Sequence, residues 1–519
     1  MKIFSAALMT ALIIFTGAAN AEDNLTITLE EAIALALANN RLIEQAQEDR
    51  ESARLELSNA RKSFGPTLSW DSSSMRIGGR YYHSQRDERY RVRAMDKETR
   101  RERGINLADY PPYKSSNSNS VTLSIPLYTG GQLEGEIQSA NFGLNSADLT
   151  LENTRQAVKF QTAQAYYQVL QYKNLMDVRQ EALNNLNEHL RVVQIQYDVG
   201  NVAMSDVIET KVQIADSRQG FNTARGDYAN ALATLNNIIG LPTDTKLAVT
   251  DDLDYLPNEQ SEIECLEYAL EHRPDGIAAV YEIKRAEAQL SAAKSGFRPN
   301  VSALVQGSMT GEGAFKADQS KEQWAAGIRL QWDIFDNNVT STKVAQAKSA
   351  QRKAESVARQ NLETIRLEVH NAYTNLKIAE ENIQITSEAI EQAKEKFLIA
   401  QVRYEEGEDT NLPVMDAQEK LTNAQINYFD ALYSYNLNRA QLEKAMGIPI
   451  EIDAAIYSAA VKDGKTATKA LKQSAVAPST VLDENGKVKK RSEDDIQPER
   501  KSETEILRDE PFAKKDYRE

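Results

Sequence analysis

The sequence predicts a mainly α-helical chain with a small transmembrane β part and an internal twofold duplication. Three observations support this prediction. Proline, which breaks helices, is absent between Pro126 and Pro242 and again between Pro299 and Pro413, in a chain of 519 residues. Apolar residues in those windows recur at the 3-4 spacing of coiled coils. Four short segments elsewhere alternate apolar and polar residues, as half-buried strands do.

The first 21 residues have the composition of a secretory signal peptide. Lys2 supplies a positive charge, an apolar stretch runs from Ile3 to Phe15, and Ala19-Asn20-Ala21 is a small-x-small cleavage site. The alternative, an N-terminal membrane anchor, is disfavoured because the apolar run is short and no stop-transfer charges follow it. We therefore expect a mature protein that begins near Glu22 and lies outside the cytoplasm.

The overall charge and the cysteine content disfavour two classes of protein. A formal net charge of −15 is unfavourable for a general nucleic-acid binder. The single cysteine, Cys265, cannot form a disulfide within the chain, and we expect it to be a buried small hydrophobe. Charge is unevenly distributed, because residues 76–114 hold 11 Lys/Arg against 6 Asp/Glu while the rest of the chain is acidic.

The duplication appears when the chain is compared with itself at a shift of 207 residues. Tyr197-Asp198-Val199-Gly200 then falls on Tyr404-Glu405-Glu406-Gly407. Gly240-Leu241-Pro242 falls on Gly447-Ile448-Pro449. We expect a first structural repeat over residues 22–242, a linker over 243–262 and a second repeat over 263–449, with a tail over 450–519.

Each repeat is expected to contain helices of unusual length. Amphipathic runs open the repeats at residues 28–63 and 263–295. The first has a capping box at Thr28 and Glu31, and the second is broken by Arg273-Pro274. Heptads then predict long helices over about 133–199 and 338–405, each roughly 100 Å at 1.5 Å per residue. Shorter helices follow at 202–239 and 412–446. The helices by themselves would also suit a soluble coiled-coil scaffold without a pore.

The strand-like segments favour a membrane protein over that scaffold. They cover about residues 67–77, 119–128, 299–309 and 324–335, lengths with which a tilted strand can cross a bilayer. The three tryptophans of the chain, Trp70, Trp324 and Trp332, all lie in these segments, and we interpret them as membrane-interface anchors. In the alternative, a soluble hairpin, the same residues would form its core.

Four strands per chain cannot close a membrane barrel, because the smallest such barrels have about 8 strands and lipid does not tolerate open sheet edges. The chain must therefore oligomerise, as a dimer, trimer or tetramer. The long helices would continue the barrel wall, and the resulting tube would be a conduit.

The residues also resemble a known family. Four features show the resemblance. They are the segment Leu29-Glu30-Glu31-Ala32-Ile33, a Phe-x-Pro before the first strand of each repeat, the duplication and the pair of Tyr-x-x-Gly turns. Together they resemble the TolC family of outer-membrane efflux and secretion channels, over about residues 25–450. The resemblance implies a homotrimer in the outer membrane of a Gram-negative bacterium, with a 12-stranded barrel and a periplasmic α-helical barrel. It also implies a periplasmic adaptor and an inner-membrane pump of RND or ABC type as partners.

The resemblance further implies roles for the two Tyr-x-x-Gly turns at the periplasmic end. The turns would carry the adaptor-docking tips, at Tyr197, Gly200, Tyr404 and Gly407. The periplasmic gate would include Asp206, Tyr404, Glu408, Asp409 and Asp416. This sequence departs from the family pattern at two positions. Pro413 stands where better-known members have an aspartate, and Asp409 stands where they have an arginine. Glu405, Glu406, Glu408, Asp409 and Asp416 thus crowd the second turn without a nearby base. We expect their repulsion to favour opening, and the negative ring of three copies to favour cations and to bind divalent ions weakly.

Two further segments lie outside the repeated pattern. The basic insertion, residues 76–114, is expected to be a long extracellular loop that meets anionic lipopolysaccharide or partly covers the exit. The tail, residues 462–519, is a near-neutral polyampholyte that we expect to be disordered on the periplasmic side.

No catalytic function is indicated. The four histidines, His83, His189, His272 and His370, form no metal-spaced or triad pattern, and the chain has no P-loop or Gly-x-Ser-x-Gly motif. We therefore expect no enzyme activity, no cofactor, no metal site and no nucleic-acid partner. The predicted function is the exit duct of a tripartite efflux pump or a type I secretion system, and the alternative is a periplasmic coiled-coil scaffold or adaptor.

Overall fold

The structure is a computed structural model that describes residues 25–76, 79–105, 115–312 and 322–450. The predicted signal peptide and almost all of the predicted C-terminal tail lie outside these described residues.

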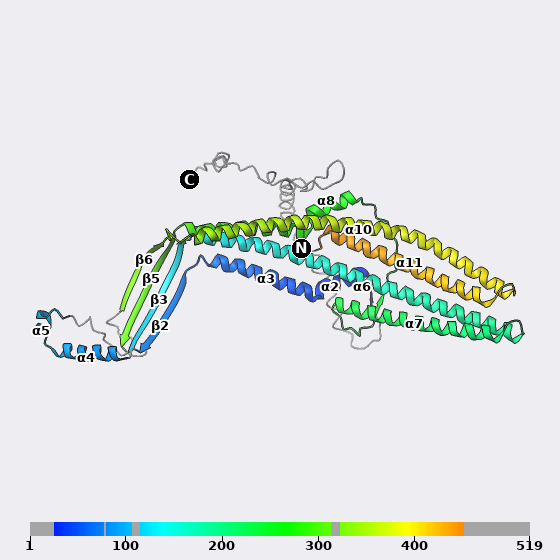
Figure 1. The fold of residues 1–519 in the computed structure, drawn as a ribbon, viewed down its shortest axis with the longest axis horizontal. Helices are drawn as coiled ribbons and strands as arrows, with labels where there is room; N and C mark the ends of the chain where they lie inside the picture. Colours follow the sequence, from blue (N-terminus) through cyan, green and yellow to red (C-terminus); the bar gives the residue numbers. More distant parts are fainter. Residues whose placement is uncertain (1–24, 77–78, 106–114, 313–321, 451–519) are drawn as a thin grey trace, which may run out of the picture. The chain divides into compact units, whose positions relative to one another are not determined.

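The long helices follow the duplication closely. Helices α6 (Gln132–Asp198) and α10 (Val339–Glu405) have 67 residues each, and both ends of one fall on the ends of the other at the 207-residue shift. Each is followed by a returning helix, α7 (Met204–Ile238) or α11 (Asn411–Met446), which packs against it (Figure 1). The internal duplication predicted from the sequence is therefore confirmed.

The heptad seam of α10 is buried against its neighbours. Val369, Leu376 and Ile383 are among its buried residues. Thr162 interrupts the corresponding seam of α6, yet it is also fully buried. Its hydroxyl donates to the carbonyl of Val158 at 2.8 Å, so the polar atom is satisfied within its own helix.

Shorter helices open each repeat and pack on the long ones. They are α2 (Leu29–Asn39) and α3 (Arg41–Lys62) in the first repeat, and α8 (Glu262–His272) and α9 (Pro274–Lys294) in the second. The expectation of one continuous run over 28–63 is wrong at Asn40. This residue is extended, and its side chain accepts a hydrogen bond from the Leu42 amide at 2.9 Å, which caps α3.

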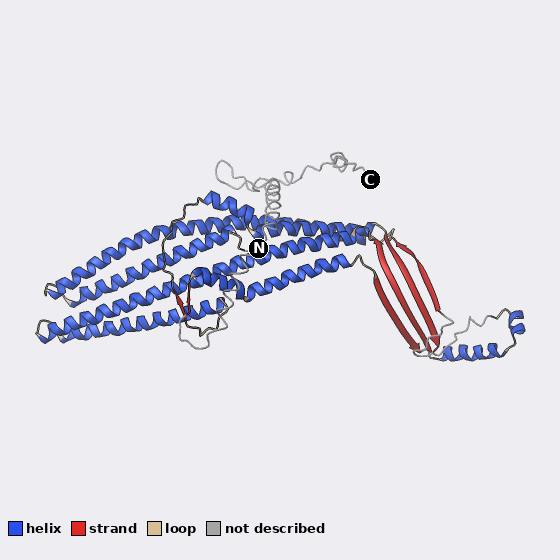
Figure 2. Ribbon diagram, turned by 180° about the vertical axis from the view of Figure 1, so that it is seen from behind, coloured by secondary structure: helices blue, strands red, loops and turns tan. Residues whose placement is uncertain are grey.

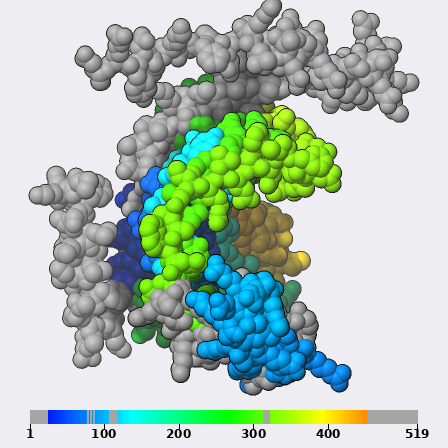
Figure 3. Space-filling model, turned by 90° about the vertical axis from the view of Figure 1, so that its left-hand side faces the viewer, coloured from blue at the N-terminus to red at the C-terminus, as the bar shows by residue number. Residues whose placement is uncertain are grey.

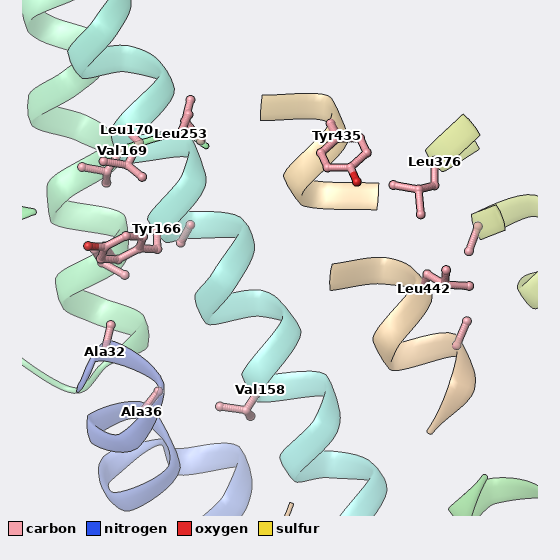
Figure 4. Close-up of a cluster of buried hydrophobic side chains, with 14 of the residues drawn as sticks. Ala32, Ala36, Val158, Tyr166, Val169, Leu170, Leu253, Leu376, Tyr435 and Leu442 are labelled. Atoms are coloured by element: carbon pink, nitrogen blue, oxygen red, sulfur yellow. The ribbon is translucent and has the colours of Figure 1, made fainter. Parts of the chain in front are cut away.

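A small parallel sheet that the sequence reading missed joins the start of the described chain to the linker. Strand β1 (Leu25–Ile27) pairs with β4 (Leu247–Val249). Beside it the hydroxyl of Tyr166 on α6 lies 2.8 Å from the Asp251 carboxylate, which also accepts from the Leu29 amide. Figure 4 shows Tyr166 in the main core cluster, to which α2, α6, α10 and α11 all contribute. Cys265 is buried in the same cluster, as expected.

The remaining strands form one four-stranded antiparallel sheet of the described chain, ordered β2-β3-β5-β6 (Figure 2). They are β2 (Thr67–Arg76), β3 (Ser115–Tyr128), β5 (Asn300–Glu312) and β6 (Glu322–Gln331). The predicted strand 324–335 extends too far, because regular pairing ends at Gln331. Trp332 and the following apolar residues continue the alternating pattern without being paired in this chain.

The basic insertion is helical where it is described. Helix α4 (Arg80–Ala94) begins four residues after β2 ends, and the short helix α5 (Lys97–Glu102) follows it. The insertion connects β2 to β3, as expected, but the sequence did not indicate that it contains helices. The Asp96 side chain accepts from the Thr99 amide at 2.8 Å and caps α5.

Candidate functional site

One face of the four-stranded sheet is apolar over the part that adjoins the long helices. Strand register places Trp70, Val121, Gly307 and Trp324 in one row across all four strands. Because directly paired residues share a face, the two tryptophans mark the same level on the two edge strands. The rows from this level toward the helices supply the following side chains to the face: Leu68, Leu123, Ile125, Ala303, Val305, Ala326, Ile328 and Leu330.

The opposite face is mainly polar, as the alternation requires. It carries Ser69, Asp71, Thr122, Ser124, Gln306, Ser308, Gln323 and Arg329. The tryptophans on the apolar face are open: 72% of Trp70 and 79% of Trp324 is exposed in the single chain. The soluble-hairpin alternative is therefore wrong, because it would bury these rings as a core.

The apolar face has the height of a membrane band. Trp332, which is half exposed, lies eight residues from Trp324, so the two rings bracket about 26 Å of strand at ~3.3 Å per residue. At a tilt of about 40° that distance spans about 20 Å, close to the ~25 Å apolar band of outer-membrane barrels between its aromatic girdles. The Trp332 indole donates to the Phe297 carbonyl at 3.3 Å and keeps its polar edge satisfied.

The two Tyr-x-x-Gly turns end the long helices in the same way. Gly200 and Gly407 have φ of 82° and 77°, the left-handed region that favours glycine. The Gly200 amide donates to the Tyr197 carbonyl at 2.9 Å, and the next amide donates to Gln196 at 2.8 Å. Gly407 and Glu408 make the equivalent pair of bonds, to Tyr404 and Arg403. This pair of backbone hydrogen bonds ends a helix and lets the chain reverse within a few residues.

A small core joins the two helix turns to each other. Duplicate positions contribute to it, since Val193 and Val207 of the first repeat pack with Ala400 and Val414 of the second. Tyr404 is only 3% exposed there, and its ring meets the His189 ring edge-on at 5.0 Å between centroids. The side chain of Tyr404 thus lies inside the joint, whereas Tyr197 is 38% exposed.

A chain of hydrogen bonds runs through this joint and links three helices. His189 Nε2 on α6 contacts Asn411 Oδ1 on α11 at 2.7 Å. Asn411 Nδ2 donates to Thr210 Oγ1 on α7 at 3.1 Å, and Thr210 donates to the Asp206 carbonyl at 2.8 Å. Since Asn411 accepts from the ring, Nε2 carries the proton. We name His189, Asn411 and Thr210, all buried, the turn network.

The sequence reading missed the turn network. The four histidines were expected to form no metal-spaced or triad pattern, and His189 was given no role. The heptad spacing could have indicated that His189 is buried. It lies three residues after Leu186 and four before Val193, both on the buried face of α6.

Three acidic residues of the second turn, Glu408, Asp409 and Asp416, have cationic partners, which corrects the expectation that no base lies near. Arg403 lies 3.9 Å from Glu408 and 3.7 Å from Asp409. Asp416 contacts Lys420 at 2.7 Å, and Lys396 of α10 at 3.7 Å. The Lys420 ammonium, with Lys396, holds the pKa of Asp416 below its ordinary value. Repulsion among these carboxylates is therefore offset within the chain.

Asp206, the acidic position of the first turn, lies close to Tyr404. Burial, and then the Asp206 charge, raises the pKa of the Tyr404 hydroxyl. Within the described chain that buried hydroxyl has no hydrogen-bond partner.

Neither a metal centre nor a membrane-spanning helix is found in the parts of the chain that the structure describes. No group of three or more His, Cys, Asp or Glu side chains there could hold a metal ion. None of the described helices combines the length and the hydrophobicity that a transmembrane helix requires.

Comparisons with known proteins agree with this geometry. The model of the family described as outer membrane efflux protein matches residues 32–241 and 265–448. Outer membrane efflux protein BepC of Brucella suis is 23% identical over 316 residues, 60% of this chain and 68% of the relative. Outer membrane protein TolC of Escherichia coli is 24% identical over 324 residues, 59% of this chain and 64% of the relative. The CmeC outer membrane channel of Campylobacter jejuni has the same fold, with a TM-score of 0.68 at 17% identity, over 84% of this chain and 89% of that one.

Proposed function

The chain belongs to the outer membrane efflux protein family, and we propose that three copies of it form the exit duct of a tripartite efflux pump or a type I secretion system. As a member of that family it is an outer-membrane protein with a large periplasmic helical part. The observation that most strongly supports the duct is the sheet, whose apolar face is exposed and whose other face is polar.

The sheet edges require that several copies assemble, and the family supports three as their number. Strands β2 and β6 each leave one side unpaired within the described chain. Lipid does not accept such edges, so β6 of one copy pairs with β2 of the next until the barrel closes. Three copies give 12 strands. The row that carries Trp70 and Trp324 would then supply two tryptophans per copy to the outer girdle.

The periplasmic turns form the mouth of the proposed duct. Asp206, Glu408, Asp409 and Asp416 give it a negative lining when three copies assemble, which favours cations. The exposed Tyr197 side chain and the Gly200 and Gly407 turns provide the surface for a periplasmic adaptor and its inner-membrane pump. The chain itself supplies no catalysis and no energy, so the pump drives transport.

The lining role of Asp416 is tested by the conductance of the Asp416→Ala channel in planar bilayers. We expect cation selectivity to fall and block by divalent cations to weaken, because one carboxylate is lost from each copy. Glu363→Ala, an exposed acid of α10 far from the turn, is the matched control and should change neither property. Unchanged selectivity and block in Asp416→Ala would remove this residue from the mouth.

The duct itself is tested by cell fractionation of the native protein. We expect it in the outer membrane as a trimer that resists detergent until heated. Deletion of residues 67–128 should abolish insertion, because it removes half of the strands in each chain. A soluble monomer would contradict the duct and favour the alternative, a periplasmic scaffold.

A further inference from the structure

The four-stranded sheet continues beyond its apolar band on the side away from the long helices. Past the Trp70 and Trp324 row, strand β2 runs six more residues to Arg76. Apart from Met75 and Met309, the paired residues of this extension are mostly small and polar on both faces, and they include Ser72, Ser73, Ser74, Asn117, Ser118 and Asn119. Such a surface is suited to water or hydrated sugar rather than to acyl chains.

The extension places the basic insertion well above the tryptophan row. Six residues cover about 20 Å along a strand, or about 15 Å normal to the membrane at a ~40° tilt. Helix α4 begins four residues further, at Arg80. Tryptophan rings sit at the headgroup level. The helix therefore starts about 15 Å outside that level, where the anionic core sugars of the outer-leaflet glycolipid lie.

The described part of the insertion is strongly basic. Residues 79–105 hold nine Lys/Arg against five Asp/Glu, a net charge of +4 in a chain whose total is −15. The acids are partly engaged, since Asp96 caps α5 and Glu88 lies 3.4 Å from Arg91. Exposed cations remain on both helices and the turn after them: Arg80, Arg91, Arg93, Lys97, Arg101 and Arg103. Figure 3, seen from this end of the protein, shows the insertion in blue at the surface.

We propose that α4 and α5 are a docking surface for the anionic glycolipid of the outer leaflet, lipopolysaccharide. Arginine pairs with the phosphates and carboxylates of its core sugars through two parallel hydrogen bonds. Tyr90, 63% exposed among these arginines, adds a ring that packs on sugar faces. The height above the membrane band favours this partner over nucleic acid, which the acidic chain as a whole repels.

This inference rests on the proposed membrane placement and gives the basic insertion a specific partner. The test measures binding of rough lipopolysaccharide, lipid A with a phosphorylated inner core, to the full-length protein in detergent. Wild type is compared with the triple variant Arg91→Gln, Arg93→Gln, Arg101→Gln. We expect at least tenfold weaker binding and a smaller dependence on salt in the variant. The reason is that it lacks three arginine charges that pair with phosphates of the lipopolysaccharide.

Three controls make the result specific. The variant Glu98→Gln, Glu102→Gln alters α5 alone, by removing acids, and should bind at least as tightly as wild type. Lysine at positions 91, 93 and 101 should recover part of the affinity, because charge returns without the paired hydrogen-bond geometry. Dephosphorylated lipopolysaccharide should bind wild type no better than phosphorylated lipopolysaccharide binds the glutamine variant.

Two results would overturn the proposal. One is equal affinity of wild type and the glutamine variant for rough lipopolysaccharide. The other is tighter binding of single-stranded DNA than of lipopolysaccharide at equal salt, which would assign the surface to nucleic acid. The glutamine variant should still insert and conduct, since the insertion lies outside the membrane band. Failure of wild type to reach the outer membrane would instead contradict the duct.

Discussion

His189 occupies an unusual position for an ionisable residue at the end of a long helix. It is buried between helices α6, α10 and α11, with Asn411 at hydrogen-bond distance and the Tyr404 ring edge-on. Burial lowers the pKa of His189 from its ordinary 6.5, against the smaller opposing effects of Asn411 and the Glu405 charge. The neutral ring is the form that fits the turn network, because only one ring nitrogen there needs a proton.

This lowered pKa makes the stability of the turn joint depend on pH. Below about pH 6.5 the unfolded chain binds a proton at His189 that the folded chain does not, so acidification favours unfolding. The loss is about 1.4 kcal/mol for each unit by which the pKa is lowered, and it stops once the pH passes below the folded pKa. We expect the unfolding midpoint of wild type to fall more between pH 7.5 and 5.5 than that of His189→Gln.

Thermal unfolding of the detergent-solubilised protein at the two pH values measures this difference. His370→Gln, an exposed histidine of α10 that pairs with Glu262, is the control and should keep the wild-type pH dependence. If His189→Gln kept the full wild-type dependence, another group would be responsible.

At the scale of elements, the packing of α6 on α9 depends on the absence of a side chain at Gly135. A Cβ there would meet the Ala292 side chain and backbone at 2.8 Å and the Ala288 carbonyl at 2.9 Å. Gly135 lies in the first turn of α6, close to the point where strand β3 ends and the long helix begins. This close approach brings the two repeats together at the base of the proposed barrel.

Gly135→Ala should therefore destabilise the protein although alanine is the better helix former. Alanine favours a helix by about 1 kcal/mol over glycine, but overpacking of this kind costs about 1–3 kcal/mol. Gly226→Ala in α7 is the matched control, since nothing lies within 4 Å of its added Cβ and it should stabilise. Denaturant unfolding midpoints measure both. A Gly135→Ala protein as stable as Gly226→Ala would mean that α6 and α9 move apart without cost.

At the scale of the whole molecule, the single chain is incomplete. Its sheet exposes an apolar face and two unpaired edges, and both defects are removed only when copies assemble within a membrane. The long helices, by contrast, already bury their seams within the single chain. Assembly is therefore expected to depend on the sheet more than on the helices.

Chemical cross-linking of the purified full-length protein tests the copy number. We expect a ladder of bands that ends at three chains, because three sheets of four strands close the proposed barrel. Replacing Ile328 and Leu330, on the apolar face of edge strand β6, with aspartate should reduce the trimer band, since lipid-facing charge is costly. A ladder that ended at two or four chains would contradict the trimer. The pair Gln323→Asp and Ala325→Asp, on the polar face of the same strand, should leave the ladder unchanged.

Much of this architecture follows from the sequence by itself. Absence of proline and a heptad pattern, which is unbroken in α10 and interrupted in α6, indicate where the long helices lie, because these signals are local and repeat over many turns. Alternation likewise identifies the apolar face of the sheet, and the repeated Tyr-x-x-Gly pattern identifies the glycines that end the helices. Asn40 was missed because a single polar residue does not interrupt the helical period. The helices of the basic insertion were missed because a polar helix without an apolar stripe carries no periodic signal.

Only the tertiary structure determined which distant residues meet. His189, Thr210 and Asn411 are far apart along the chain, and their spacing carries no motif that links them. The cations beside the acidic turn were hidden for the same reason, since Lys396 reaches Asp416 from a different helix. The common level of Trp70 and Trp324 required strand register across four strands. The sequence thus determined the elements and their faces, which local periodicity encodes, whereas contacts between elements depend on a packing that no local pattern records.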